Sequence, residues 1–218
     1  MLTLWHCEDS RSFRVVWAME ELGLDYRLRM LRFPPRVFQK DYLGENPLGT
    51  VPLLVDGETR MTESTAIMHY LAMRHAQGRL VPPPGDPTYG AYLNWLVHGE
   101  ATLTFPQTIF LRYTRLEPEE RRQLQAADDY RRWFLARLRL LDASLAQTGP
   151  YLTGPDFTLA DISVGYAIML ALTLGLKDEL PARALDWFSR LQERPAFASA
   201  KARQRRDADE QGIGAATL

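Results

Sequence analysis

The chain has 218 residues, of which 46% are hydrophobic and 24% charged, as expected for a soluble protein with one large or two small domains. Its 26 lysines and arginines against 27 aspartates and glutamates give a formal charge of −1, so nothing in the charge points to nucleic-acid or membrane binding. The single cysteine, Cys7, excludes an internal disulfide and favours a reducing, cytoplasmic compartment. No basic flank with an apolar run follows Met1, so we expect no export signal.

Short strands alternate with helices along residues 1–77. We predict strands over residues 2–6 and 26–31, a hairpin of 53–55 and 59–61, and helices over 13–22 and 63–74. Residues 37–43 are expected to form a short helix or an irregular turn. The first two strands flank a helix and should be parallel, whereas the hairpin strands around Asp56-Gly57 should be antiparallel. The pattern predicts a small mixed sheet with helices packed against it.

Residues 78–87, GRLVPPPGDP, are predicted to form a semi-rigid linker, because three consecutive prolines cannot lie inside a helix. Beyond it, residues 88–218 are predicted to form an all-helical domain. Apolar residues within one long helix step by three and four: Ala127, Tyr130, Phe134, Leu138, Leu141 and Leu145. Arginines and aspartates alternate on the other face, which favours a solvated surface over an anion site.

Two further segments of this domain carry structural signals. The uncharged run 162–176 is shorter than the roughly 20 residues that span a bilayer and indicates a buried core helix. In FTLADI, residues 157–162, Thr158 and Asp161 have the spacing of a capping box, so we expect Asp161 to be buried and needed for folding. The polar tail from Arg203 onward is expected to be frayed.

Four segments resemble, in order, landmarks of the cytosolic glutathione transferases: SRSFRVVWAMEELGLDY at 10–26, NPLGTVPLL at 46–54, ES at 63–64 and FTLADI. The resemblance covers essentially the whole chain. FQKDYLGENP at 38–47 is most similar to the zeta and related bacterial classes, and HCEDSRSFRVVW to bacterial and fungal members without the usual tyrosine. The resemblance implies an α/β thioredoxin-like amino-terminal domain and an all-α carboxy-terminal domain. It also implies a cytoplasmic homodimer that uses glutathione as co-substrate and needs no metal.

The resemblance implies that the amino-terminal domain binds glutathione, γ-Glu-Cys-Gly, through its peptide backbone and through the charged groups at its two ends. The bond before Pro52 is expected to be cis, so that the backbone of Val51, next to Thr50, pairs with the cysteine of the peptide as an added strand would. Ser64, at a helix start, would bind the γ-glutamyl carboxylate, and Glu63 would bind the ammonium group. An ordinary helix cap at Ser64 uses the same geometry.

The glycine carboxylate of glutathione would be held by basic or amide side chains before the Asn-Pro pair. The candidates are Gln39, Lys40 and Arg36, which the sequence does not rank.

The reaction requires a thiolate, and the hydroxyl of Ser10, before the first helix, is our candidate to stabilise it. Ser12 is the fallback, and Arg11 could contribute electrostatically. In zeta-like and tau-like patterns the catalytic serine would fall on position 9, which is aspartate here. Because a carboxylate raises the pKa of a neighbouring thiol, Asp9 must point away or serve some other role, or the enzyme is poor in the standard reaction.

The electrophile is expected to contact the wall formed by residues 93–113, which Pro106 should kink. The candidates to face it are Phe13, Thr104, Phe105, Thr108 and Arg112. Cys7, in CEDS, is more simply a buried thiol than a redox group. The four histidines show no pairing typical of a metal site.

The function predicted is conjugation of glutathione to a hydrophobic electrophile. The alternatives are a glutathione-dependent isomerase or thiol peroxidase, and a non-catalytic module that binds glutathione or a protein. Asp9 is the feature that favours the non-catalytic alternative.

Overall fold

The structure is a computed structural model that describes residues 1–214, and its packing divides the chain into two compact units. The first unit contains Met1–Val81 together with residues 192–214, and the second contains Pro82–Leu191. The carboxy-terminal helix therefore packs with the amino-terminal residues. The domain boundaries predicted at residues 77 and 87 stay predictions.

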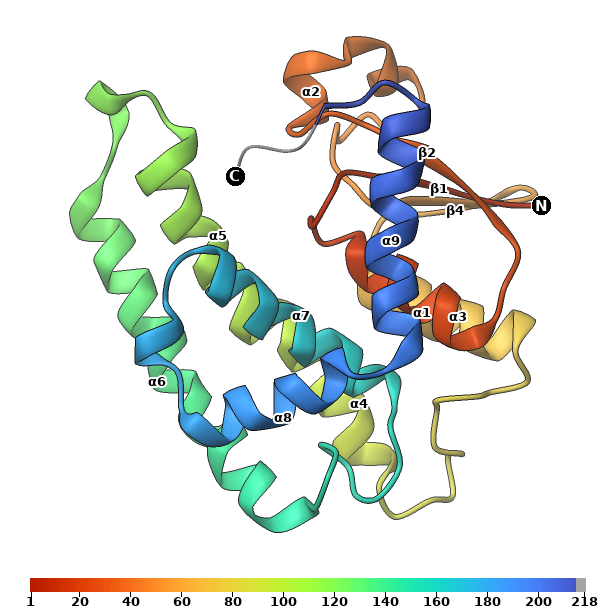
Figure 1. Ribbon diagram of the computed structural model, residues 1–218, viewed down its shortest axis with the longest axis vertical. Coiled ribbons are helices and arrows are strands. Elements are labelled where there is room, and N and C mark those ends of the chain that lie inside the picture. Colours follow the sequence, from red (N-terminus) through yellow and green to blue (C-terminus); the bar gives the residue numbers. More distant parts are fainter. Residues whose placement is uncertain (215–218) are drawn as a thin grey trace. The chain divides into compact units, whose positions relative to one another are not determined.

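The first unit is built on a four-stranded mixed sheet (Figure 1). Its elements are β1 (Leu2–His6), α1 (Phe13–Leu22), β2 (Tyr26–Met30), α2 (Pro35–Phe38), η1 (Lys40–Gly44), β3 (Leu53–Asp56), β4 (Thr59–Met61) and α3 (Ser64–His75), followed much later by α9 (Pro195–Glu210). The strand order is β2-β1-β3-β4, with β1 parallel to β2 and the other pairs antiparallel. The predicted mixed sheet and its strand directions are confirmed.

Alternation along β1 supplies side chains to both faces of the sheet. Leu4 and His6 are fully buried on the face that meets α1 and α9. On the opposite face, Trp5 packs against a cluster of buried residues: Cys7, Leu31, Tyr42 and Leu53. The sheet thus separates two cores.

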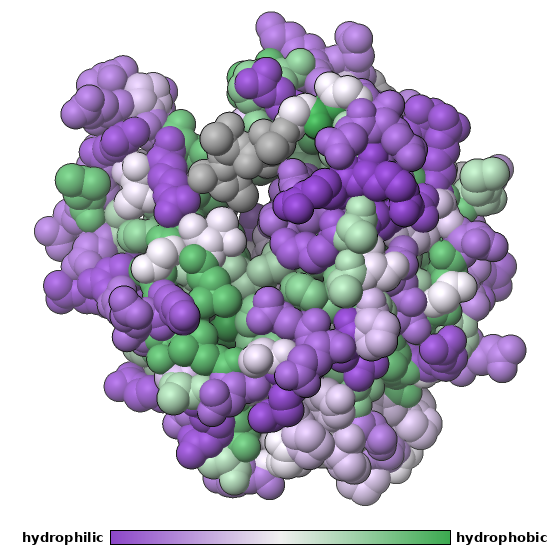
Figure 2. Space-filling view, in the orientation of Figure 1, coloured by the Kyte–Doolittle hydropathy of each residue, from purple (hydrophilic) through white to green (hydrophobic). Residues whose placement is uncertain are grey.

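Helix α9 runs along α1 and also contacts β2 (Figure 1). The ring centroid of Phe197 lies 4.9 Å from that of Trp17 and 5.6 Å from that of Phe13. Within the part predicted to be frayed, Gln204 and Asp207 are buried, and Arg203 binds the carbonyl of Tyr26 at 3.3 Å. The expectation of a frayed tail from Arg203 is wrong for residues 203–210, which belong to α9 and have hydrogen-bond partners in the sheet. Residues 215–218 of the predicted tail lie outside the described part of the chain. The outer face of α9 is strongly hydrophilic (Figure 2).

The second unit is helical. Its elements are α4 (Tyr89–His98), η2 (Gly99–Thr104), α5 (Phe105–Leu111), η3 (Arg112–Leu116), η4 (Glu119–Arg121), α6 (Leu124–Thr148), α7 (Leu159–Thr173), η5 (Lys177–Glu179) and α8 (Ala182–Gln192). The wide-turn π segment η2 ends at Thr104, two residues before Pro106, a residue that cannot donate a helical hydrogen bond.

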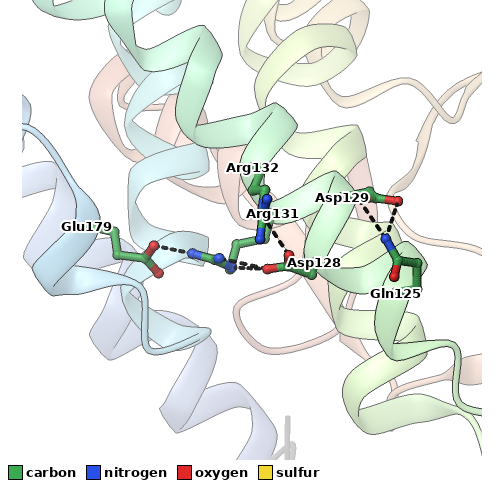
Figure 3. Close-up of polar contacts among 6 residues, drawn as sticks. All are labelled: Gln125, Asp128, Asp129, Arg131, Arg132 and Glu179. Carbon is green, nitrogen blue, oxygen red and sulfur yellow. Dashed lines mark hydrogen bonds and ion pairs between the residues drawn. The ribbon is translucent and has the colours of Figure 1, made fainter.

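Helix α6 presents a polar face whose charges pair with one another (Figure 3). Arg131 and Arg132 both bind the carboxylate of Asp128, and Arg131 also pairs with Glu179, the last residue of η5. Of the predicted apolar stripe, Tyr130 is half-buried and the other five residues are buried. These contacts support a solvated ion-pair surface rather than an anion-binding face.

Helix α7 is the core of the second unit, since Leu159–Ala171 is buried throughout. A Cβ at Gly99 would lie 2.3 Å from Ser163 Oγ, so glycine is needed where α7 meets the chain after α4. Thr158 and Asp161 form the predicted capping box, and the amides of Leu152 and Thr158 both donate to Asp161 at 2.9 Å. Among residues 1–214, no helix is long and apolar enough to cross a membrane.

Candidate functional site

A chain of hydrogen bonds begins at Ser10, directly before α1. Ser10 Oγ lies 2.8 Å from Ser12 Oγ and 2.9 Å from the carbonyl oxygen of Cys7. Ser12 Oγ lies 2.6 Å from His6 Nδ1, and His6 Nε2 lies 2.8 Å from Gln204 Oε1. The two serines predicted as candidates are therefore joined to a buried histidine and to α9.

The hydrogen-bond partners of Gln204 determine which atoms are donors in this chain of hydrogen bonds. Its Nε2 donates to a carboxylate oxygen of Asp9 at 2.7 Å, and its Oε1 accepts the backbone N–H of Asp9 at 3.2 Å. The amide oxygen therefore faces His6 Nε2, which must carry a hydrogen. Burial lowers the pKa of His6 to about 4, so the ring is neutral near pH 7 and Nδ1 is an acceptor.

The two serines consequently differ in what they can donate. The hydrogen of Ser12 is committed to His6 Nδ1, and Ser12 is fully buried. Ser10 must then be the donor toward Ser12 or toward Cys7 O, and it is 9% exposed. A rotation about one bond would turn the Ser10 hydrogen toward an incoming acceptor.

The amides at the start of α1 are already occupied. The amide of Phe13 donates to Ser10 O at 2.8 Å, and those of Val15 and Val16 donate to Ser12 O. Helix α1 can favour an anion at this end through its dipole, but these amides have no direct hydrogen bond to spare.

Asp9 has its carboxylate directed to α9. Its Oδ1 accepts from Lys201 Nζ at 2.6 Å and from Gln204 Nε2 at 2.7 Å. A thiolate at Ser10 was expected to require that Asp9 point away or serve another role, and the carboxylate has a cationic partner in Lys201.

The bond between Val51 and Pro52 is cis, as predicted. The carbonyl of Thr50, just before it, accepts hydrogen bonds from Tyr42 Oη and Asn46 Nδ2, both at 2.8 Å. Within residues 1–214, the amide and carbonyl of Val51 take part in no backbone hydrogen bond of the turns and loops. The edge before β3 is thus fixed in position while its polar groups stay available.

The start of α3 has the opposite character to the start of α1. Ser64 is its first residue, Glu63 is exposed, and in the described chain the amides of Ser64, Thr65 and Ala66 donate to no loop carbonyl. The guanidinium of Arg14, fully buried in α1, donates to Ser64 Oγ at 3.3 Å. A buried cation beside free helix amides is suited to a carboxylate.

Two of the three residues proposed for the glycine carboxylate, Gln39 and Lys40, line one cavity of about 460 Å³ together with Trp5 and Tyr42. Gln39 Oε1 accepts the amide of Arg32 at 2.7 Å, which leaves its Nε2 to face outward. Arg36 is exposed and is absent from this lining. The geometry favours Gln39 and Lys40 over Arg36.

The predicted electrophile wall needs correction at two positions. Phe13 is fully buried against Trp17 and Phe197, and Thr104 is fully buried with its hydroxyl bonded to Gly99 O at 2.7 Å. Neither offers a ligand an exposed surface, because both side chains complete cores of their own units.

The other three candidates for the electrophile wall retain exposed surface. Phe105 is half exposed, Thr108 is half-buried, and Arg112 is exposed and bound to Glu117.

Cys7 is a core residue. It is fully buried, and burial raises the pKa of its thiol to about 12, so it is not a thiolate near neutrality. This agrees with the interpretation of Cys7 as a buried thiol.

The sequence analysis missed four residues that shape the site: His6, Arg14, Lys201 and Gln204. Arg14 could have been found, because an arginine inside the apolar run FRVVWAM has to be paired or functional once that helix is buried. Nothing in the local sequence marks the other three, since their partners lie almost 200 residues away.

Known proteins share both sequence features and the fold of this chain. The sequence model described as "Glutathione S-transferase, N-terminal domain" matches residues 1–73. The chain is 33% identical to "Glutathione S-transferase GstB" of Escherichia coli (strain K12), over 90% of this chain and 95% of that protein.

Among solved structures, the chain is similar to the glutathione transferase URE2P6 of Phanerochaete chrysosporium in complex with oxidized glutathione. The TM-score is 0.78 at 25% identity, covering 94% of this chain and 96% of that one. It is also similar to a theta class glutathione S-transferase of Xanthomonas axonopodis pv. citri with glutathione bound. Here the TM-score is 0.75 at 27% identity, covering 91% and 96% of the two chains. On its motifs, its fold and its similarity along nearly the whole length of a named relative, the chain belongs to the glutathione S-transferase family.

Proposed function

We propose that this protein binds glutathione in its first unit, activates the thiol with Ser10, and conjugates it to small hydrophobic electrophiles. The observation that carries this proposal is the hydrogen-bond chain from His6 to Ser10. It leaves Ser10 as the serine whose hydrogen can turn to a sulfur atom. The predicted transferase function agrees with the named relatives and with the glutathione-bound neighbours.

Activation of the thiol has a definite energetic size. A free cysteine thiol has a pKa near 8.5, and lowering it by about two units takes roughly 2.7 kcal/mol of preferential anion stabilisation. A hydrogen bond to a charged acceptor contributes about 1.5–3 kcal/mol, and a helix dipole about 0.3–1 kcal/mol. The Ser10 hydroxyl and the start of α1 together contribute a stabilisation of the size required, and Arg11 is an additional cation nearby.

The backbone of the tripeptide would pair with Val51, next to Thr50 and Pro52. Its γ-glutamyl carboxylate would be bound by Ser64 and the free amides of α3, with Arg14 behind them and Glu63 toward the ammonium group. Its glycine carboxylate would lie toward Gln39 and Lys40. Phe105, Thr108 and Arg112 remain the candidates for the electrophile pocket.

We also propose a cytoplasmic homodimer. Exposed apolar side chains on α4 and α6 support an interface on the second unit: Leu93, Val97, Trp133 and Leu140. Sedimentation of the purified chain at several concentrations would test this assembly separately from the catalytic proposal.

Two measurements test the function. Retention on immobilised glutathione tests the binding site, and the ultraviolet absorbance of the thiolate, followed against pH, gives the pKa of the bound thiol. We expect retention and a bound thiol pKa about two units below the free value. Retention with a bound pKa near the free value would instead favour the non-catalytic binding module.

A further inference from the structure

The carboxylate of Asp9 adjoins the residue proposed to stabilise the thiolate. Its backbone is in the left-handed region, with φ of 52°, and its side chain is 29% exposed. An uncompensated carboxylate here would oppose a thiolate at Ser10, because two like charges a few ångströms apart repel each other even near the surface. The position therefore needs a counter-charge for the proposed chemistry.

Helix α9 supplies that counter-charge. Lys201 Nζ lies 2.6 Å from Asp9 Oδ1, and Gln204, one turn further along the same helix face, donates to the same oxygen at 2.7 Å. Gln204 Oε1 also accepts the backbone N–H of Asp9. The ammonium group lies 5.1 Å from the ring centroid of Phe13, the first residue of α1. Three contacts thus hold Asp9 against α9, and the cation sits at the start of α1.

Several other charged groups lie near this pair in the sequence and on α9. Glu8 and Arg11 flank Asp9 in the same turn, and His6 is neutral near pH 7. Further along α9, Asp207 is bound to Arg203 at 2.9 Å and lies 3.5 Å from Arg206. The 2.6 Å ion pair with Lys201 brings to Asp9 a cation from outside its own turn.

We propose that Lys201 is a positioning residue for thiol activation: by binding the carboxylate of Asp9, it cancels the negative charge beside Ser10 and allows a thiolate to form there. This inference rests on the proposed role of Ser10. It gives α9, a helix from the far end of the chain, a part in the chemistry as well as in the fold.

The experiment measures the pKa of bound glutathione in the full-length protein by thiolate absorbance. Lys201→Met should raise this pKa by about half a unit to one unit, which is roughly three- to tenfold less thiolate at a pH below it. Asp9→Asn alone should not raise it, because it leaves the cation without its partner. The double variant Asp9→Asn/Lys201→Met should return the pKa to within a few tenths of the wild-type value.

Arg205→Met is the matched control. It removes one positive charge from an exposed position of α9, one turn beyond Lys201. The Arg205 side chain makes no ion pair with Asp9 in the described part of the chain, so this variant should change the bound pKa by much less than Lys201→Met. Lys201→Gln is the second variant should Lys201→Met unfold, since it keeps a hydrogen-bond donor without the charge. Thermal unfolding of each variant reports whether the fold is intact.

An unchanged pKa in Lys201→Met or Lys201→Gln would overturn the inference. So would a double variant that stays as impaired as Lys201→Met, since a merely structural lysine would not be rescued by neutralising Asp9. The proposed function fails separately: if Ser10→Ala leaves the bound pKa unchanged, the thiolate is stabilised elsewhere.

Discussion

His6 and Gln204 are 198 residues apart in the chain, yet His6 Nε2 and Gln204 Oε1 lie 2.8 Å apart in the interior of the first unit. The amide oxygen can only accept, so the hydrogen of the neutral ring is on Nε2 and its lone pair faces Ser12. One contact between β1 and α9 therefore sets the direction of the hydrogen bonds that end at Ser10.

The pH dependence of stability should reveal the buried His6. Burial lowers its pKa from 6.5 to about 4, so between these values the unfolded chain binds the extra proton. The stability that His6 provides is complete above pH 6.5 and is lost as the pH falls toward 4, by up to about 3 kcal/mol. The difference in free energy of unfolding between the wild type and His6→Gln, measured in urea, should decrease as the pH falls from 6.5 toward 4. Nitrogen NMR of His6 should show a ring that stays neutral, with its hydrogen on Nε2, down to about pH 4.

The stability contributed by Asp161 should depend on pH with the opposite sign to that of His6. Burial raises its pKa from 3.8 to about 6, against the hydrogen bonds from Leu152 and Thr158, so the folded chain binds the extra proton between these values. Its contribution is complete below pH 3.8 and is lost as the pH rises to 6. The stability margin of the wild type over Asp161→Asn should therefore be largest near pH 4 and level off above 6. A margin that grows with rising pH would contradict this assignment.

Ser10→Ala should lower turnover by at least about tenfold and leave glutathione binding largely intact, because it removes a hydrogen bond made to the thiolate and not to the peptide. Steady-state kinetics with an aryl halide electrophile, together with the binding constant for glutathione, separates the two effects. Ser12→Ala is the matched control, since its hydrogen is committed to His6. If Ser10→Ala leaves turnover unchanged and Ser12→Ala or Arg11→Ala lowers it, Ser10 is not the residue that stabilises the thiolate.

Arg14→Gln should raise KM for glutathione about tenfold or more, with a smaller change in kcat. The buried guanidinium supports Ser64 at the proposed site of the γ-glutamyl carboxylate, far along the peptide from the reacting sulfur. Ser64→Ala should raise KM in the same direction. If both variants change kcat and leave KM as it was, the carboxylate binds elsewhere.

Gly49→Ala should destabilise the first unit more than Gly57→Ala. Both glycines have positive φ, +61° and +59°, so alanine is strained by about 1 kcal/mol at either position. Only at Gly49 would the new Cβ also meet neighbours, at 2.8 Å from Arg36 Cβ and 2.9 Å from Leu43 Cδ2, which adds roughly 1–3 kcal/mol. Equal losses of unfolding free energy in the two variants would mean that the loop around Gly49 accommodates the new Cβ without further destabilisation.

Local patterns were sufficient to predict most of the first unit. The strand 2–6 and the helix 13–22 coincide with β1 and α1, and the Asp56-Gly57 turn joins β3 to β4 as expected. These features depend on side chains a few residues apart: alternation, a glycine turn and a helical stripe. The capping box at Thr158 and Asp161 was equally readable, because both partners lie within one turn.

Only the tertiary structure showed that the last segment is an ordered helix and which hydrogen bonds Ser10 and Ser12 make. The segment after Arg203 is polar and gives no apolar periodicity, so it resembles a frayed tail in sequence. Gln204 and Asp207 are nevertheless buried. Gln204 has its hydrogen-bond partners, His6 and Asp9, at the other end of the chain.

The sequence by itself placed Ser10, Pro52 and Ser64 at one candidate site and raised Asp9 as an obstacle. It could not say which serine has a hydrogen to give, nor what neutralises Asp9. Both answers depend on side chains about 200 residues away, His6 with Gln204 and Asp9 with Lys201. Pairings at that separation leave no periodic trace in a single sequence and exist only once the chain has folded.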